Sequence, residues 1–177
     1  HLTVDKQHII IITEQGQALR FNSSLVRSMG RPAAGVKAIN LRKGDCISGM
    51  VTVTEDGELL VVTANGYGKR TAMAAYNPKG RATMGVATFS RKAVAKVTGP
   101  IVDVRSVQPD DQITIISANG QALRTTVSDI RLLGRATQGT RLMNLKPGDT
   151  VASVARLAAA DLPGLDMNET TIGPIAE

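Results

Sequence analysis

Short apolar, β-branched runs recur along the chain, and each is followed by a two-residue turn and a second short run that ends in arginine. The turns are Gln15-Gly16, Asn65-Gly66 and Asn119-Gly120. A turn of this composition between two strand-like runs is typical of a β-hairpin with a primed turn. The pattern therefore predicts three hairpins, over residues 10–20, 60–70 and 114–124.

A Gly-Arg-x-x-x-Gly element follows each hairpin, at residues 30–35, 80–85 and 134–139. The turn glycine and this element are 14 residues apart in every copy, whereas the copies repeat after 50 and then 54 residues. A repeat of this length is typical of propeller blades or solenoid units. The repeated unit therefore has a fixed internal length, and only the connection between units varies.

Two further strands are expected in each unit. A third should follow the Gly-Arg element, as at residues 36–41 and 140–145, and a fourth is expected at 46–53, 101–107 and 151–157. Four short strands per unit with almost no helical periodicity predict an all-β, propeller-like fold with three four-stranded blades. We expect blades at about residues 8–57, 58–111 and 112–157 within one domain, 1–157, and a flexible acidic tail over 158–177.

Composition narrows the class of protein. The 177 residues are 42% hydrophobic and 20% charged, which is ordinary for a folded chain. No apolar run approaches the roughly 20 residues of a membrane helix, so we expect a cytosolic chain without membrane contact. One cysteine, Cys46, excludes an internal disulfide, and two histidines exclude a Cys/His zinc cluster. The first residue is His1 instead of Met, so we expect a fragment or a trimmed chain; the alternative for His1 is a tag residue.

Basic residues are concentrated in the repeats. Residues 15–146 hold 19 Lys and Arg against 8 Asp and Glu, whereas residues 147–177 hold one Arg against five acidic residues. A basic body attracts a polyanion, and nucleic acid is the commonest one in the cytosol. Aromatic residues make up only 2% of the chain, which disfavours recognition of single strands by base stacking. The alternative is a basic domain whose charge only prevents aggregation.

The Gly-Arg-x-x-x-Gly loops are the first candidates for binding. Glycine at both ends allows positive φ and close approach of backbone N–H groups to a ligand, and the arginine guanidinium suits phosphate oxygens. The alternative is that the glycines only close a crossover between blades, while the arginines pair with acids such as Asp45, Asp103 or Asp149. The loop residues concerned are Gly30, Arg31, Gly35, Gly80, Arg81, Gly85, Gly134, Arg135 and Gly139.

A second set of basic residues ends the hairpins or precedes the loops. Equivalent positions of a repeat face the same way, so one basic residue per blade predicts a continuous basic stripe that contacts phosphates. The alternative for the residues ahead of the loops is an ordinary solvated surface charge. The set comprises Arg20, Lys69, Arg70, Lys79, Arg124 and Arg131.

No catalytic or metal-binding constellation is found in the sequence. His8 lies beside an apolar strand, Cys46 is expected to be a small buried side chain, and the acidic clusters at 55–58 and 110–111 fit hairpin turns. The chain has no Gly-x-x-x-x-Gly-Lys-Ser/Thr element, so we expect neither ATP hydrolysis nor a cofactor here.

Three spaced Gly-Arg-x-x-x-Gly loops, the stretch TANGYGKRT at residues 63–71 and VRSMGRPAAGV at residues 26–36 resemble the C-terminal domain of DNA gyrase A over residues 8–157. The resemblance implies a β-pinwheel, a propeller-shaped disc whose blades exchange strands and whose basic rim bends and wraps duplex DNA. It implies DNA contacts from Arg20, Arg31, Lys69, Arg70, Arg81, Arg124 and Arg135.

The same resemblance implies that the catalytic functions lie in other domains of the enzyme. Catalysis, ATP and Mg²⁺ would belong to the remaining domains of gyrase A and to gyrase B, which are the expected partners. The whole enzyme would be a nucleoid-associated type II topoisomerase of the cytoplasm.

The chain departs from that family in two respects. The family disc typically has six blades where about three are expected here, and no stretch matches the family's Gln-Arg-Arg-Gly-Gly-Lys-Gly box, which wrapping requires. The leading hypothesis is duplex DNA binding and wrapping without sequence specificity. The alternative is a propeller scaffold or protein-interaction module, including one like topoisomerase IV, whose arginines form salt bridges between blades.

Overall fold

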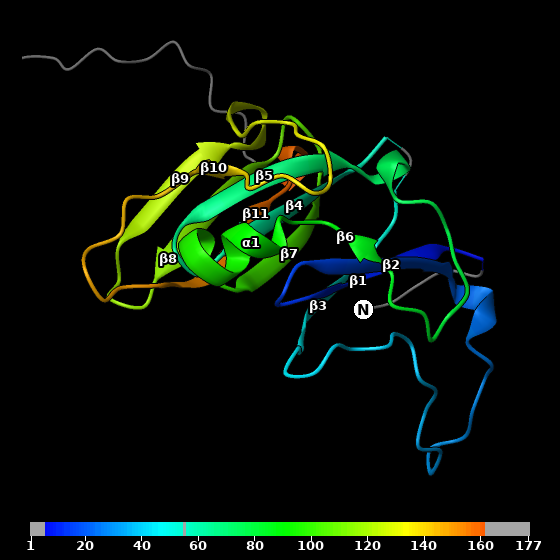
Figure 1. Ribbon diagram of the computed structural model, residues 1–177. Helices are drawn as coiled ribbons and strands as arrows, with labels where there is room; N and C mark the ends of the chain where they lie inside the picture. Colours follow the sequence, from blue (N-terminus) through cyan, green and yellow to red (C-terminus); the bar gives the residue numbers. More distant parts are fainter. Residues whose placement is uncertain (1–5, 55, 162–177) are drawn as a thin grey trace, which may run out of the picture.

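The computed structural model describes residues 6–54 and 56–161, which form three antiparallel sheets (Figure 1). The first has the order β3-β1-β2-β6, from β1 (His8–Thr13), β2 (Gln17–Asn22), β3 (Ile47–Thr52) and β6 (Val86–Ala87). The second has the order β10-β5-β4-β7, from β4 (Glu58–Thr63), β5 (Tyr67–Ala72), β7 (Ile101–Val107) and β10 (Thr140–Arg141). The third has the order β11-β8-β9, from β8 (Gln112–Ser117), β9 (Ala122–Thr126) and β11 (Val151–Leu157). The predicted all-β, blade-like architecture is confirmed, with three strands instead of four in the third sheet.

Each predicted hairpin is present. β1 pairs with β2, β4 with β5 and β8 with β9, and the turn glycine has a φ of 86° at Gly16, 77° at Gly66 and 82° at Gly120. Residues with a β-carbon rarely adopt this conformation, so each turn needs its glycine. A short 3-10 turn follows each hairpin: η1 (Ser23–Leu25), η2 (Met73–Ala75) and η4 (Val127–Asp129).

Two short strands cross from one unit to the sheet of the preceding unit. β6 follows Gly85 of the second unit but pairs with β2, and β10 follows Gly139 of the third unit but pairs with β5. Main-chain hydrogen bonds therefore join consecutive blades, as the resemblance implied. Residues 36–41, where a strand was expected, form only an isolated bridge between Ile39 and Thr83. The described residues contain no preceding hairpin with which this segment could pair.

Other local expectations are wrong. The third strand of the third unit ends at Arg141 instead of residue 145. A helical segment that no periodicity predicted, α1 (Arg91–Ala93) followed by the π-helical turn η3 (Val94–Thr98), precedes β7. Cys46 is exposed, not buried. The expected acidic tail lies outside the described residues except for 158–161, which contain the 3-10 turn η5 (Ala159–Asp161).

The core lies between the sheets, with β4 at its centre. Leu59 and Val61 pack into a cluster shared with the first sheet, whereas Leu60 and Val62 pack into a cluster shared with the third. All four are almost fully buried, and each contributes about 1.5–3 kcal/mol by leaving water. The second sheet is therefore a middle layer that fixes the positions of the loops on either side.

Candidate nucleic-acid interface

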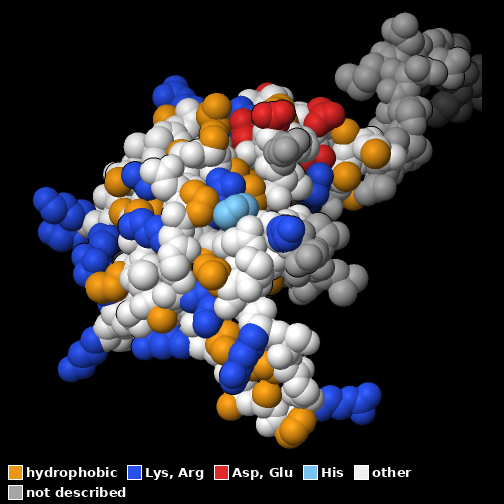
Figure 2. Space-filling view, turned by 90° about the vertical axis from the view of Figure 1, so that its right-hand side faces the viewer, with side chains coloured by type: hydrophobic (Ala, Val, Ile, Leu, Met, Phe, Trp, Pro, Cys, Tyr) orange, Lys and Arg blue, Asp and Glu red, His pale blue; other side chains and the backbone are white. Residues whose placement is uncertain are grey.

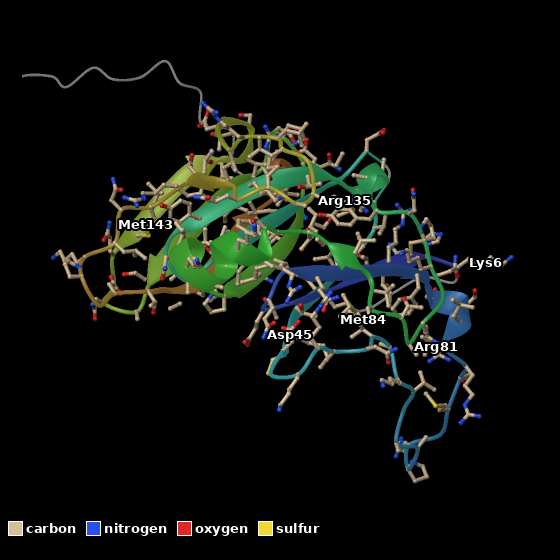
Figure 3. The ribbon with its side chains drawn as sticks, in the orientation of Figure 1. Lys6, Asp45, Arg81, Met84, Arg135 and Met143 are labelled. Atoms are coloured by element: carbon tan, nitrogen blue, oxygen red, sulfur yellow. The ribbon has the colours of Figure 1, made fainter. Side chains whose placement is uncertain are left out.

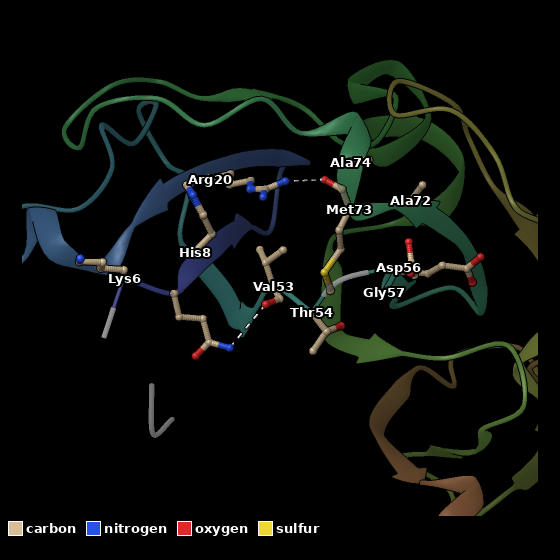
Figure 4. A pocket seen from close by; sticks show the side chains of 12 residues that line it. Lys6, His8, Arg20, Val53, Thr54, Asp56, Gly57, Ala72, Met73 and Ala74 are labelled. Carbon is tan, nitrogen blue, oxygen red and sulfur yellow. Dashed lines mark hydrogen bonds between the residues drawn. The ribbon is translucent and has the colours of Figure 1, made fainter. Parts of the chain in front are cut away.

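Arg20 ends the first hairpin and clamps it to the second unit. Its Nη1 donates to the backbone oxygen of Met73 at 3.0 Å (Figure 4) and to that of Tyr76 at 3.2 Å. Burial lowers the pKa of Arg20 from its ordinary value. The half-buried guanidinium stabilises the contact between blades.

Arg70 has the same position in the second unit and makes the same kind of contact with the third. Its Nη1 forms an ion pair with Oε2 of Glu58 at 2.7 Å, and both side chains are buried. Nε donates to the backbone oxygen of Ile130 at 2.6 Å, and Nη2 donates to that of Ser128 at 3.1 Å. Both hairpin arginines thus reach the end of the 3-10 turn in the following unit. Arg70 does not lie on an exposed stripe.

Arg124 occupies the third equivalent position and is exposed. Its Nε donates to Oε1 of Gln112 at 2.6 Å, across the hairpin. Within the described chain it reaches no following unit.

Lys69 is fully buried, which corrects its predicted place on the basic stripe. Its Nζ donates to the backbone oxygen of Gly134 at 2.6 Å, to that of Arg135, and to Oγ1 of Thr137 at 2.9 Å. The ammonium also lies 5.2 Å from the centre of the Phe89 ring. Burial lowers the pKa of Lys69 to about 8. The side chain of Lys69 thus holds the third Gly-Arg loop by its backbone.

The three loop arginines differ in their contacts. Arg31 is exposed and Arg135 is half-buried, and neither guanidinium has a hydrogen bond or ion pair among the described residues. Arg81 donates to the backbone oxygens of Leu25 at 2.8 Å and Lys37 at 2.9 Å. Figure 3 shows Arg81 and Arg135 on two separate loops. Arg31 and Arg135 therefore have guanidinium groups available for an external anion, whereas the Arg81 guanidinium already binds two backbone oxygens.

The acids considered as partners for these arginines are engaged elsewhere. Asp45 accepts the backbone N–H of Gln15 at 3.0 Å, and Asp149 accepts that of Asn119 at 3.1 Å, so each caps a hairpin turn. Asp103 pairs with Arg105 at 2.9 Å. Salt bridges from the loop arginines to these acids are absent from the described part of the chain.

The two glycines of each loop have different roles. The second, at Gly35, Gly85 and Gly139, has positive φ, and a β-carbon at Gly85 would lie less than 3.0 Å from the backbone oxygen of Ala18. The first glycine, at positions 30, 80 and 134, does not have positive φ. A β-carbon at either of the last two would meet nothing within 4 Å. The expectation that both ends of the loop need positive φ is therefore correct only for the second glycine.

The remaining candidates, Lys79 and Arg131, are exposed, and only their backbones contact the neighbouring hairpin, at Arg20 and Arg70. Figure 2 shows Lys and Arg side chains along one side and the lower part of the molecule, with acidic side chains at the opposite, upper end. Basic and acidic side chains of the described residues thus gather on different parts of this face.

Sequence reasoning missed a further basic cluster. Arg91, Lys92 and Lys96, on α1 and η3, are all exposed. The run RKAVAK at residues 91–96 was the available signal, and it falls outside the repeated motif. Arg141 is also exposed; its Nη2 donates to the hydroxyl of Tyr67 at 2.9 Å.

Other classes of site find no support within the described residues. They contain no group of three or more His, Cys, Asp or Glu side chains placed to hold a metal ion. The same residues contain no helix long and apolar enough to cross a membrane.

Comparison with known proteins decides the family. The model of the DNA gyrase C-terminal domain, a beta-propeller, matches residues 7–54, 57–98 and 111–158. This chain belongs to the DNA gyrase C-terminal domain family. The three matched stretches each contain one hairpin of the structure.

Individual gyrase relatives agree with this assignment. The chain is 37% identical to DNA gyrase A of Chlamydia trachomatis over 159 residues, which is 89% of this chain and 19% of the relative. It is 38% identical to DNA gyrase A of Escherichia coli K12 over 157 residues, 89% of this chain and 18% of the relative. The chain thus spans about a fifth of the length of these relatives.

Solved structures of the domain show the same fold. A DNA gyrase A C-terminal domain superposes with a TM-score of 0.81 at 30% identity, covering 88% of this chain and 52% of that one. The C-terminal domain of a DNA topoisomerase IV gives 0.84 at 28% identity, covering 91% and 50%. The chain corresponds to about half of each, and its fold is related to both topoisomerases.

Proposed function

We propose that this chain binds, bends and wraps duplex DNA without sequence specificity, and thereby supports ATP-dependent negative supercoiling by a gyrase holoenzyme. The observation that carries the proposal is the division among the basic residues. Arg20 and Arg70, which end the first two hairpins, form hydrogen bonds between blades. Within the described residues, the side chains of the loop residues Arg31 and Arg135, and of Lys79 and Arg131 beside the loops, form no internal hydrogen bonds or ion pairs.

The contact surface recurs once per unit. Each unit carries a loop arginine at position 31, 81 or 135. The second and third loops are followed by β6 and β10, which pair with the sheet of the preceding unit. Contacts to phosphate oxygens position DNA on a protein without reading its sequence. Sequence preference would arise from the ease with which DNA bends, because bending costs less at flexible steps.

Arg20, Lys69 and Arg70 support this surface from inside. Lys69 holds the backbone of the loop that carries Arg135, and the two arginines hold the blades at a fixed separation. Their contribution to DNA binding is therefore indirect.

The partners follow from membership of the gyrase family. The remaining domains of gyrase A, together with gyrase B, would supply strand cleavage, ATP hydrolysis and Mg²⁺, and this chain would hold the DNA in the cytoplasm, at the nucleoid. It needs no cofactor for that task.

A linking-number assay tests the proposal. Relaxed circular duplex is incubated with the chain and then treated with topoisomerase I, so that any writhe held by the protein remains as a changed linking number. We expect a shift that grows with protein concentration and disappears at high salt. Binding without any shift would contradict wrapping, and no binding at low salt would contradict DNA binding altogether.

The second candidate, a scaffold whose arginines join blades, is favoured by one observation. Arg20 and Arg70 do bind between units. A scaffold would give neither a linking-number shift nor salt-sensitive DNA binding, so the same assay separates the two functions.

A further inference from the structure

The hairpin arginine of each unit has a neighbour on the same face of the sheet, at the start of the first strand of the hairpin. The strand register places the two positions diagonally across the strand pair in all three units. The three pairs, in chain order, are His8 with Arg20, Glu58 with Arg70 and Gln112 with Arg124. The arginine is constant, so the units differ only in the side chain beside it.

In the second and third units this neighbour supplies an oxygen to the arginine. Oε2 of Glu58 accepts a hydrogen bond from Nη1 of Arg70 at 2.7 Å, and Oε1 of Gln112 accepts one from Nε of Arg124 at 2.6 Å. All three guanidinium nitrogens of Arg70 donate hydrogen bonds. An oxygen acceptor at this position is therefore a regular part of the unit, a carboxylate in one copy and an amide in the other.

The first unit lacks this oxygen, because His8 places an imidazole there. Arg20 donates only from Nη1, to the backbone oxygens of Met73 and Tyr76. Its Nε is buried without a partner, and Nη2 donates to no described residue. Nδ1 of His8 is likewise buried without a partner. Buried polar groups in folded proteins are nearly always paired, and an Arg edge with two N–H donors suits the two oxygens of a carboxylate or phosphate.

A hollow of about 550 Å³ lies beside this pair, between the first and second units (Figure 4). Figure 4 shows His8 and Arg20 on one side of the hollow and Asp56 on the other. Lys6 adds a second cation to the lining, and Glu58, which also lines the hollow, is already held in its own ion pair. The hollow therefore provides room for a small ligand next to the unpaired side chains.

We propose that a small oxyanion of the phosphate class binds between the first two units, at Arg20 and His8. Its oxygens accept hydrogen bonds from Nε and Nη2 of Arg20, and so replace the carboxylate that Glu58 supplies to Arg70. Nδ1 of His8, when it carries a proton, donates a further hydrogen bond. Because Arg20 also holds the second unit through Met73, the bound anion stabilises the contact between the two blades.

A free anion fits this site better than a phosphate of DNA. Nε of Arg20 is buried, and Nη1 is already bound to the second unit, so a ligand has to enter the hollow instead of lying across the surface. A phosphate within DNA carries a sugar on either side, whereas inorganic phosphate does not. The site is therefore separate from the loop arginines Arg31 and Arg135 that are proposed to contact DNA, and it does not depend on that function.

Titration with inorganic phosphate tests the site, with the N–H resonance of the Arg20 Nε group followed by NMR. Arg20→Met assigns this resonance by its absence, and sodium chloride keeps the ionic strength constant. We expect the resonance to move saturably in the native chain. His8→Glu supplies the missing carboxylate, so it should weaken phosphate binding at least about tenfold and raise the melting temperature in chloride. A merely structural role of His8 would not give a loss of binding together with a gain in stability.

Gln112→Glu is the matched control. It makes the same change of charge as His8→Glu when His8 is neutral, at the equivalent position of a unit whose arginine already has an oxygen acceptor. It should leave the phosphate affinity of the Arg20 site unchanged. A resonance that does not respond to phosphate, or that responds alike in the native chain and in His8→Glu, overturns the proposal.

Duplex DNA affinity separates the two sources of phosphate. We expect His8→Glu and Gln112→Glu to bind duplex DNA equally well at the same salt concentration. A loss of DNA affinity in His8→Glu alone would assign the site to a phosphate of DNA and overturn the proposal of a free anion.

Discussion

Nζ of Lys69, on β5, lies 2.6 Å from the backbone oxygen of Gly134, a residue of the following unit. The same ammonium donates to the backbone oxygen of Arg135. A buried lysine thus fixes the backbone of the loop that carries the half-buried Arg135, and it links the core of the second sheet to the surface proposed to bind DNA.

Replacing this lysine should loosen the third loop. Lys69→Met keeps the length of the side chain but removes the ammonium donor from three oxygens, of which the Gly134 oxygen still accepts the hydroxyl of Thr137. The loss should cost about 1–3 kcal/mol in the free energy of unfolding. Amide hydrogens of residues 134–139 should exchange faster. Lys92→Met, at an exposed position, is the control and should change the free energy by less than about 0.5 kcal/mol. Unchanged exchange in the Lys69 variant would contradict this role.

The pKa of Lys69 predicts a pH dependence of stability. Burial lowers this pKa from 10.5 in the unfolded chain to about 8 in the folded one. Between these two pKa values Lys69 is protonated more often in the unfolded chain than in the folded chain. The contribution of Lys69 to the free energy of unfolding is therefore lowest below about pH 8 and increases as the pH rises toward 10.5. The native chain should therefore gain stability relative to Lys69→Met from about pH 8 to about pH 10. Denaturant titrations at each pH measure this difference, and a constant difference would rule the effect out.

Arg70 should matter more for stability than Arg20. Arg70→Met leaves Glu58 as an unpaired buried charge, which should cost about 3–5 kcal/mol, whereas Arg20→Met removes hydrogen bonds to two backbone oxygens and should cost about 1–3 kcal/mol. Denaturant unfolding measures both. The additional substitution Glu58→Gln should recover part of the loss in the Arg70 variant. Equal losses for the two single variants would contradict the importance of the buried ion pair.

The two glycines of the second loop, Gly80 and Gly85, can be compared by replacing each with alanine. Gly85→Ala introduces a β-carbon less than 3.0 Å from a backbone oxygen, at a φ of 67°, and should lower the melting temperature by several degrees, as expected for a loss of at least about 1 kcal/mol. Gly80→Ala meets no atom within 4 Å and should leave stability nearly unchanged. If the two variants melt alike, strand exchange does not depend on close approach at Gly85.

Much of the fold could be predicted from local chemistry. The β-branched runs and turn glycines identify the hairpins, since positive φ at Gly16, Gly66 and Gly120 is a local requirement. The sheet to which a crossing strand belongs could not be predicted, because two residues such as Val86 and Ala87 carry no signal for their partner. Strand exchange entered the sequence analysis only through the resemblance.

The basic stripe was predicted less well, because basic residues were assigned to the surface by residue type alone, without comparing each with the residues at the same position in the other units. Lys69 occupies the place of Leu19 and Leu123, and a lysine in an apolar position is a sign of burial. Arg20 and Arg70 bind backbone oxygens of the next unit. A sequence does not show such partners, so these arginines were expected at the surface. The loop arginine Arg31 is exposed as expected, since no element packs over its side chain in the described chain.

The salt dependence of DNA affinity tests most directly the claim that the loop arginines neutralise phosphates. Replacing both Arg31 and Arg135 with Gln should reduce the slope of log affinity against log salt by about 2, because each phosphate contact contributes about one unit. The matched control replaces Arg42 and Lys146, which are exposed at the turns after Leu41 and Leu145, and it removes the same charge. The account predicts that the control keeps nearly the native slope. A control that loses as much slope as the loop variant would contradict it, because net charge alone would then explain binding.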